Sequence, residues 1–230
     1  MMILAIDSAT RWAGLALYDG TAVIAEYGWR CLNNHTIELT PAIAEMGERV
    51  GVSPADWKGI AVAVGPGSYT GLRVGLALGK GLALANQIPL IGVPTLDIVA
   101  ASIQQSSEQL LVAAAAGRSR VCAAVYQWQT RGGWQARRPA VIDSWENILS
   151  GVSKPTLFVG EITPEAARLI KSANKEFRVG TPALSTRRAG FLAELGWQRL
   201  RKGQIDDASS LAPIYLRDPA GQKIESSAID

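Results

Sequence analysis

Two turns in the first third of the chain contain the residue types that hold phosphate in many proteins. In the first, "AIDSATRW", Asp7 ends an apolar run and is followed by Ser8 and Thr10. Hydroxyl and backbone N–H groups in such a turn can bind a phosphate, and the carboxylate can reach a metal-bound water. The same side chains can instead cap the turn through hydrogen bonds to nearby backbone. The spacing leaves both interpretations open.

The second turn, "GPGSYTG", places Gly65 and Gly67 between an apolar run and an expected helix. Free N–H groups and the dipole at a helix N-terminus can bind an anion. The spacing is neither that of a Walker loop nor that of the dinucleotide fingerprint. A turn that only joins a strand to a helix accounts for the glycines equally well.

The chain contains few of the histidine and cysteine residues that serve as metal ligands or nucleophiles in enzymes. His35 is the only histidine, and the two cysteines, Cys31 and Cys122, lie far apart in the sequence. A His-pair metal site is therefore impossible, and there is no CxxC motif or Cys–His signature of a peptidase. His35 precedes an expected helix, where a structural or interfacial role is simpler than a catalytic one. We expect no catalytic residue and no metal site in this chain.

Composition predicts a globular protein. Of 230 residues 48% are apolar and the formal net charge is +3, without a run of five basic residues. Eight basic residues of the second half indicate either an ordinary solvated surface or a peripheral contribution to nucleic-acid binding. They are the arginines at 131, 137, 138, 187, 188, 199 and 201 and the lysine at 202. The chain shows no signal peptide and no apolar stretch long enough to span a bilayer, and its cysteine usage fits a reducing compartment. A cytoplasmic location is expected.

The order of apolar runs predicts two related α/β lobes. Strands at 2–8, 12–20 and 21–29, with an Asp-Gly turn, precede a helix over 35–50, a strand at 60–65, a helix over 68–86, a strand at 88–93 and a helix around 95–105. The second half repeats this order, with a helix expected over 186–202. We place the first lobe at 1–103, the second, smaller lobe at 104–218 and a mobile tail at 219–230.

The helix over 68–86 carries glycine at every fourth position, at Gly71, Gly75 and Gly79. Each costs about 1 kcal/mol relative to alanine in a helix interior. The helix is also apolar nearly all round, except for Arg73 and Lys80, so it must be covered on more than one side. One cover is its own sheet. The other is either the helix over 35–50 alone or a further helix, from this chain or another, packed against the glycines.

The segments "ILAIDSAT", "HTIELTPAI", "VGPGSYTGLRVGLALGKGLA", "PLIGVPTL" and "PIYLR" together resemble the TsaB (YeaZ) family of bacterial tRNA threonylcarbamoyladenosine biosynthesis proteins. The resemblance covers most of residues 2–100 and a short piece near 213–217. It implies two ribonuclease-H-like lobes, with mixed sheets and flanking helices, of the actin, sugar-kinase and heat-shock ATPase superfamily. It also implies a non-catalytic scaffold subunit that binds TsaD, the paralogue that transfers the threonylcarbamoyl group to the adenosine beside the tRNA anticodon.

The resemblance further implies partners and a contact surface. A TsaE-type ATPase joins the complex, tRNA is engaged indirectly through it, and homodimers form when TsaD is absent. The helices over 35–50 and 68–86 would bind TsaD, and we assign the interface to His35, Thr36, Leu39, Ile43, Tyr69, Leu72, Gly75, Leu76 and Gly79. The two turns would then be a vestigial phosphate or nucleotide loop, comprising Asp7, Ser8, Thr10, Gly65, Gly67, Arg73 and Lys80.

The catalytic paralogue has a metal-binding H-x-x-x-H after the strand that matches "PLIGV". Thr95 and Val99 stand at the corresponding positions here, and neither replaces an imidazole ligand. We expect no tightly bound cofactor, with ATP or ADP at most at the interface of the complex beside Arg73 and Lys80. The alternative is a small ATP-dependent kinase or ATPase of the same superfamily that uses Asp7 and Thr10 on phosphate and metal.

Overall fold

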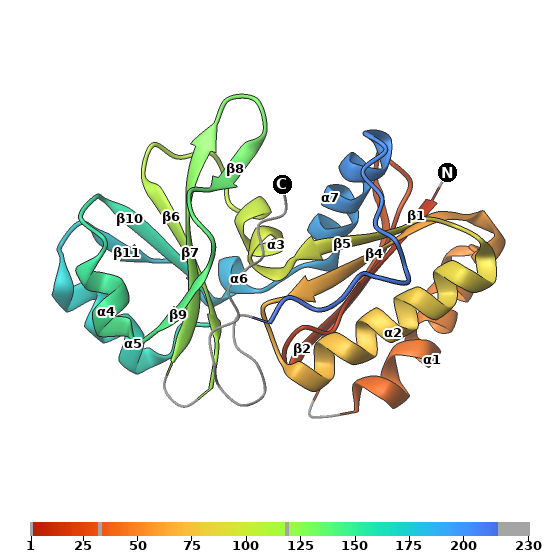
Figure 1. The fold of residues 1–230 in the computed structure, drawn as a ribbon, viewed down its shortest axis with the longest axis horizontal. Coiled ribbons are helices and arrows are strands. Elements are labelled where there is room, and N and C mark those ends of the chain that lie inside the picture. The colour runs from red at the N-terminus through yellow and green to blue at the C-terminus, as the bar shows by residue number, and fades with distance from the viewer. Residues whose placement is uncertain (1, 32–33, 118–119, 216–230) are drawn as a thin grey trace. The chain divides into compact units, whose positions relative to one another are not determined.

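The computed structural model describes residues 2–31, 34–117 and 120–215, and these form two compact units. Residues 1–98 and 187–214 belong to unit 1, and residues 99–186 make the body of unit 2. Each unit is a mixed sheet with helices against it (Figure 1). The tail expected at 219–230 lies outside the described residues. Within the described part of the chain, no helix is both long and apolar enough to cross a bilayer.

The sheet of unit 1 combines an antiparallel meander with parallel strands. Its strands are β1 (Met2–Asp7), β2 (Trp12–Tyr18), β3 (Val23–Arg30), β4 (Trp57–Gly65) and β5 (Leu90–Pro94), in the order β3-β2-β1-β4-β5. The strands β1, β2 and β3 pair antiparallel, whereas β4 is parallel to β1 and to β5. This is the sheet that the order of apolar runs predicted. The central strand β1 ends at Asp7, so the fold places that carboxylate at one edge of the sheet.

Helices cover both faces of this sheet because β1 and β4 are apolar on both sides. Leu4 and Ile6 belong to the core under α1 (His35–Val50) and α2 (Tyr69–Asn86). Ile3 and Ala5 alternate with them and belong to the core under α7 (Ala189–Arg201). A short 3₁₀ turn, η1 (Pro54–Asp56), precedes β4, and α3 (Thr95–Ala101) follows β5.

The division of the chain differs from the expected one, because residues 187–214 belong to unit 1 and not to the second lobe. The reason is α7, whose small and apolar side chains fit the open face of the first sheet. A Cβ on Gly196 would lie 2.5 Å from that of Ala61 on β4, so the glycine lets this helix approach closely. Trp197 packs edge-on against Tyr18 of β2, with ring centroids 6.1 Å apart.

Unit 2 is built in the same way, with strands first and then alternation of helices and strands. Its sheet has the order β11-β10-β6-β7-β8, with β9 paired to β7. The elements are β6 (Gln109–Ala115), β7 (Val121–Gln129), β8 (Gly133–Ala136), β9 (Val141–Asp143), α4 (Trp145–Ser150), β10 (Thr156–Gly160), α5 (Pro164–Ala173), β11 (Phe177–Val179) and α6 (Pro182–Ser185). Phe158, Ile170 and Phe177 lie in the core between this sheet and its helices.

Candidate functional site

The carboxylate of Asp7 is held in a buried ion pair with Arg187, which enters from the segment just before α7. Arg187 donates from Nε to Asp7 Oδ2 at 2.8 Å and from a terminal nitrogen to Thr10 Oγ1 at 2.6 Å. The other carboxylate oxygen, Oδ1, accepts the backbone N–H of Ala9 at 2.9 Å. Asp7 is 1% exposed and Arg187 5% exposed. The carboxylate is therefore neutralised and hydrogen-bonded on both oxygens within unit 1.

This arrangement favours the structural interpretation of the "IDSAT" turn. An acid that reaches a metal-bound water is accessible to that water, whereas Asp7 is buried and each of its oxygens already has a protein partner. Thr10 accepts both from Arg187 and from the backbone N–H of Trp12, at 3.2 Å. The turn is held by its own hydrogen bonds and by an arginine that local sequence spacing could not identify, 180 residues away.

The second turn packs against the first. The backbone N–H of Ser68 donates to the carbonyl of Ala9 at 2.6 Å, and a Cβ on Gly67 would overlap that same carbonyl. Ser68 is the N-cap of α2, and its hydroxyl accepts the N–H of Gly71 at 3.3 Å. The structure thus brings the two expected turns together. Gly67 lets the chain pass from β4 to α2 in close contact with Ala9, and Gly65, with a φ of +112°, lies against Ile214 and Leu72.

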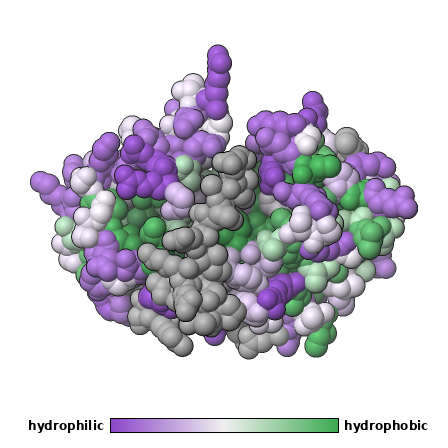
Figure 2. Space-filling view, in the orientation of Figure 1, coloured by the Kyte–Doolittle hydropathy of each residue, from purple (hydrophilic) through white to green (hydrophobic). Residues whose placement is uncertain are grey.

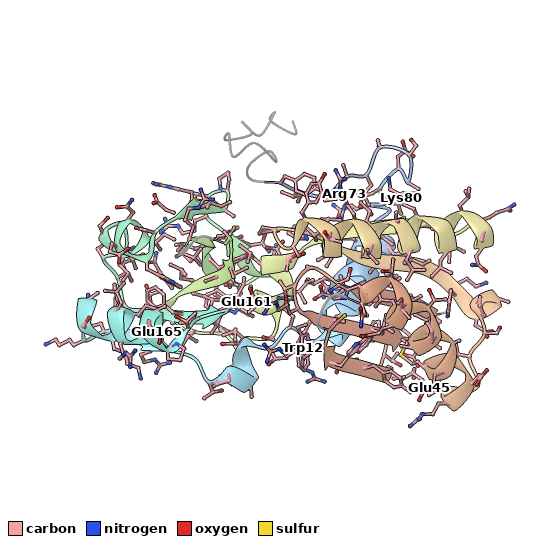
Figure 3. The ribbon with its side chains drawn as sticks, turned by 90° about the horizontal axis from the view of Figure 1, so that it is seen from below. Trp12, Glu45, Arg73, Lys80, Glu161 and Glu165 are labelled. Carbon is pink, nitrogen blue, oxygen red and sulfur yellow. The ribbon has the colours of Figure 1, made fainter. Side chains whose placement is uncertain are left out.

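The two expected counter-charges lie elsewhere. Arg73 and Lys80 project from the same side of α2 (Figure 3), away from the sheet, and Arg73 is exposed. Its guanidinium lies 3.9 Å from the centroid of the Tyr69 ring, in a cation–π contact. Ser8, by contrast, contacts the inner side of α2, where its hydroxyl donates to the carbonyl of Gly71 at 2.8 Å. These two cations are therefore not part of one site with Asp7.

The glycine stripe of α2 faces the sheet of its own unit, which corrects the expectation that a partner helix packs on it. A Cβ on Gly71 would overlap the carbonyl of Ser8, one on Gly75 its hydroxyl, and one on Gly79 the side chain of Val62. The glycines let α2 lie close to β1 and β4. Leu39, Ile43, Leu72 and Leu76 are also buried in the cores of unit 1, so they too are inaccessible to a partner.

The remaining residues of the expected interface, His35, Thr36 and Tyr69, lie at the opposite side of the two helices. We call this surface the α1–α2 outer face and define it by the exposed residues Thr36, Ile37, Thr40, Tyr69, Thr70, Arg73, Ala77 and Leu84. Ile37 is 71% exposed and Leu84 79% exposed. The face thus combines two exposed apolar side chains, one near the start of α1 and one near the end of α2, with threonines and an arginine.

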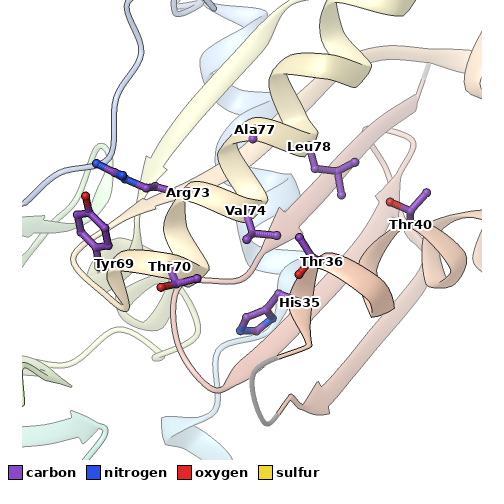
Figure 4. A pocket seen from close by; sticks show the side chains of 9 residues that line it. All are labelled: His35, Thr36, Thr40, Tyr69, Thr70, Arg73, Val74, Ala77 and Leu78. Atoms are coloured by element: carbon purple, nitrogen blue, oxygen red, sulfur yellow. The ribbon is translucent and has the colours of Figure 1, made fainter.

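A cavity of about 520 Å³ opens on this face between the N-terminal halves of α1 and α2 (Figure 4). Its lining residues are His35, Thr36, Thr40, Tyr69, Thr70, Arg73, Val74, Ala77 and Leu78. His35 is 9% exposed, and its Nδ1 has no hydrogen-bond partner among the described residues. The imidazole is therefore buried under the cavity wall, and the threonines and Arg73 are the polar groups that a molecule in the cavity can reach.

The N-terminus of α1 is fixed beside this cavity. The indole N–H of Trp29, on β3, donates to the carboxylate of Glu38 at 2.6 Å, and this hydrogen bond lowers the pKa of Glu38. The first turn of α1 is thereby tied to the edge of the sheet. The cavity wall on the side of α1 is consequently held in place by bonds within unit 1.

Two further groups carry structural roles. Thr95, one of the two residues that the resemblance compared with metal ligands, is buried and accepts the backbone N–H of Gly65 at 3.1 Å. Burial raises the pKa of Cys122 to about 12, so its thiol is a poor nucleophile. Among the described residues no cluster of three histidine, cysteine, aspartate or glutamate side chains could hold a metal ion.

Comparison with known proteins agrees with this architecture. The model of the family "TsaD: tRNA N6-adenosine threonylcarbamoyltransferase" matches residues 30–223. The "tRNA threonylcarbamoyladenosine biosynthesis protein TsaB" of Bacillus subtilis is 33% identical over 222 residues, which cover 94% of each chain. Among solved structures, YeaZ from Pseudomonas aeruginosa superposes with a TM-score of 0.76 at 22% identity, over 93% of this chain and 100% of that chain.

A more distant likeness defines the class. The activator of the 2-hydroxyisocaproyl-CoA dehydratase from Clostridium difficile, at 10% identity, superposes with a TM-score of 0.51 over 94% of this chain and 100% of that chain. The fold is thus the α/β fold with two mixed sheets that this chain shares with YeaZ and with the activator. Within that class, the chain belongs to the TsaB (YeaZ) family, as the identity to the Bacillus relative along nearly its whole length shows.

Proposed function

We propose that this chain is a non-catalytic subunit of the complex that makes threonylcarbamoyladenosine in tRNA, and that it binds a TsaD-type catalytic subunit through the α1–α2 outer face. The names of its relatives support the pathway, and the match to the TsaD family model supports a TsaD-type partner. A TsaE-type ATPase, and a second copy of this chain when the catalytic subunit is absent, are the further partners that we propose.

The observation that carries the proposal is the outer face with its cavity. Exposed Ile37 and Leu84 offer apolar area, and the cavity presents three threonines and Arg73 to a partner. A protein side chain that enters the cavity would bury apolar area and exclude water from the threonines around it. The glycine stripe plays no direct part, since it faces the sheet.

The alternative function, a small ATP-dependent kinase or ATPase, depended on Asp7 and Thr10. In unit 1 both side chains are bonded to Arg187, at 2.8 and 2.6 Å. Phosphate and Mg²⁺ would have to displace a buried arginine from its ion pair, at a cost of several kcal/mol. The geometry therefore favours the non-catalytic role.

The test is the substitution Ala77→Arg, in the wall of the cavity on α2. Ala77 is exposed, so the larger side chain leaves the core intact while it fills the cavity and adds a charge. We expect the dissociation constant of the complex with a TsaD-type protein to rise at least about tenfold, or about 1.4 kcal/mol, as measured by isothermal titration calorimetry.

The matched control is Ala183→Arg, an exposed alanine on α6 in unit 2 that undergoes the same chemical change. It should bind the partner as the wild type does. Equal affinity of all three proteins for the TsaD-type subunit would exclude the outer face as the interface, and no binding by the wild type would reject the proposed function itself.

A further inference from the structure

The β7–β8 hairpin of unit 2 is a rigid projection that the proposed contact with TsaD does not use. Residues 130–132 join the two strands, and Trp128 stands directly opposite Trp134. Their rings meet edge to face with centroids 5.6 Å apart, and the indole N–H of Trp134 donates to the carbonyl of Ile103 at 2.9 Å. The hairpin protrudes from its unit (Figure 1), and this hydrogen bond ties it to the segment before β6.

The hairpin is basic and is free of acidic residues. Between positions 109 and 142 the sequence holds five arginines and no aspartate or glutamate. Three of these arginines, Arg131, Arg137 and Arg138, are exposed on the hairpin and the segment that follows it. The projecting end of the hairpin is hydrophilic (Figure 2). Such a segregation of charge produces a local positive potential although the net charge of the whole chain is small.

These three arginines also differ from other exposed arginines of the chain in their contacts. Arg49, Arg168 and Arg188 each form an ion pair with a glutamate. No ion pair joins Arg131, Arg137 or Arg138 to any other described residue. Glu108, the acid just before β6, is bonded to Arg178 at 3.2 Å. The hairpin therefore presents guanidinium groups whose charge is not balanced within the described part of the chain.

Four other exposed side chains of the hairpin are hydrogen-bond donors as well. Gln127 and Gln135 stand opposite one another on its two strands, and Gln129 and Thr130 lie at its tip. Arginine forms forked hydrogen bonds with phosphate, and glutamine and threonine commonly bond phosphate and sugar oxygens of nucleic acids. The indole N–H of Trp134 is bonded within unit 2, and neither Trp128 nor Trp134 is fully exposed. Stacking of these rings on bases is therefore not the way in which the hairpin would bind a nucleic acid.

We infer that the β7–β8 hairpin, with Arg131, Arg137 and Arg138, is a contact surface for the phosphate backbone of RNA, and that in the complex it contacts the tRNA substrate. The choice of tRNA among RNAs rests on the proposed function, whereas the affinity for an RNA backbone rests on the hairpin alone. Contacts to phosphate carry no sequence information, so the hairpin positions the tRNA and leaves the choice of base to the catalytic subunit.

The experiment compares two triple variants of the full chain that lose the same charge. One is Arg131→Gln with Arg137→Gln and Arg138→Gln. The control is Lys154→Gln with Lys171→Gln and Lys175→Gln, three exposed lysines elsewhere in unit 2. Binding of a fluorescently labelled, unmodified tRNA transcript is followed by anisotropy at several salt concentrations. It is measured with the chain alone and with its complex with a TsaD-type protein.

Because each phosphate contact contributes about 0.7–0.9 to the slope of log affinity against log salt, the arginine variant should lose about 2–3 from that slope. Its affinity should fall at least about tenfold near ~0.15 M salt, while the control behaves as the wild type. The inference is overturned by equal losses in both variants, by an unchanged slope, or by a wild type that binds no tRNA in either state. Complex formation, read separately by size exclusion, reports on the proposed function.

Discussion

Arg187 is the residue on which the structure of the "IDSAT" turn depends most. Its guanidinium is buried with Asp7, so removal of one partner leaves an uncompensated charge in the interior. We predict that Arg187→Ala lowers the free energy of unfolding by about 3–5 kcal/mol, as measured by urea denaturation. Arg168→Ala breaks an ion pair that is fully at the surface and should change the same quantity by less than about 1 kcal/mol.

A double substitution, Asp7→Asn with Arg187→Met, separates the pair from the packing around it. It removes both charges, so it should cost less than the sum of the two single changes. If Arg187→Ala were no more destabilising than Arg168→Ala, the buried ion pair would not exist in solution, and Asp7 would again be a candidate for phosphate and metal chemistry.

At the scale of single residues, the sequence predicted the turn after Asp7 but did not predict which residue binds its carboxylate. The position of Asp7 at the end of an apolar strand, and the hydroxyls after it, could be predicted from the pattern of residues. Arg187 could not be predicted as the partner, because nothing in the spacing of a chain relates two residues 180 positions apart. The only available signal was an arginine at the start of a predicted helix.

At the scale of the element, α2 carries glycines with two different environments. The Cβ that alanine would add at Gly75 overlaps the hydroxyl of Ser8, which itself donates to Gly71, whereas nothing lies within 4 Å of the Cβ position at Gly81. We predict that Gly75→Ala destabilises the protein by about 1–3 kcal/mol despite its better helix propensity. Gly81→Ala should stabilise it by about 0.5–1 kcal/mol.

Thermal unfolding of the two alanine variants against the wild type measures this difference. Equal stabilisation by both substitutions would mean that the glycine stripe is not in contact with β1 and Ser8. In that case a partner helix would again be a candidate to cover it.

The helix α2 also shows what periodicity can and cannot predict. The recurrence of Gly71, Gly75 and Gly79 indicated correctly that something approaches this helix closely. The pattern does not distinguish a strand from a helix as the neighbour, because a glycine without a Cβ allows either element to approach closely. The neighbour is the sheet of the same unit. The surface available to a partner is on the other side, where Ile37 and Leu84 are exposed.

At the scale of the whole molecule, the two α/β units were predictable from the repeated order of strands and helices. The residues that belong to each unit were not predictable from it. The segment from 187 to 214 belongs to unit 1, although it follows the body of unit 2, residues 99–186, in the sequence. Local composition places a boundary where the chain becomes polar and cannot show that a later helix returns. That return also brings Arg187 to Asp7, so the missed boundary and the missed ion pair have one cause.

The central claim, that this chain supports a reaction catalysed by another subunit, is tested most directly by reconstitution. Purified TsaD-type and TsaE-type proteins are given tRNA and the threonylcarbamoyl donor, with and without this chain, and the modified adenosine is quantified by mass spectrometry of the digested tRNA. We expect modification to require this chain and the chain alone to form none, and the Ala77→Arg variant should restore less than the wild type at limiting concentration. Full modification without the chain, or formation of the product by the chain alone, would contradict the claim.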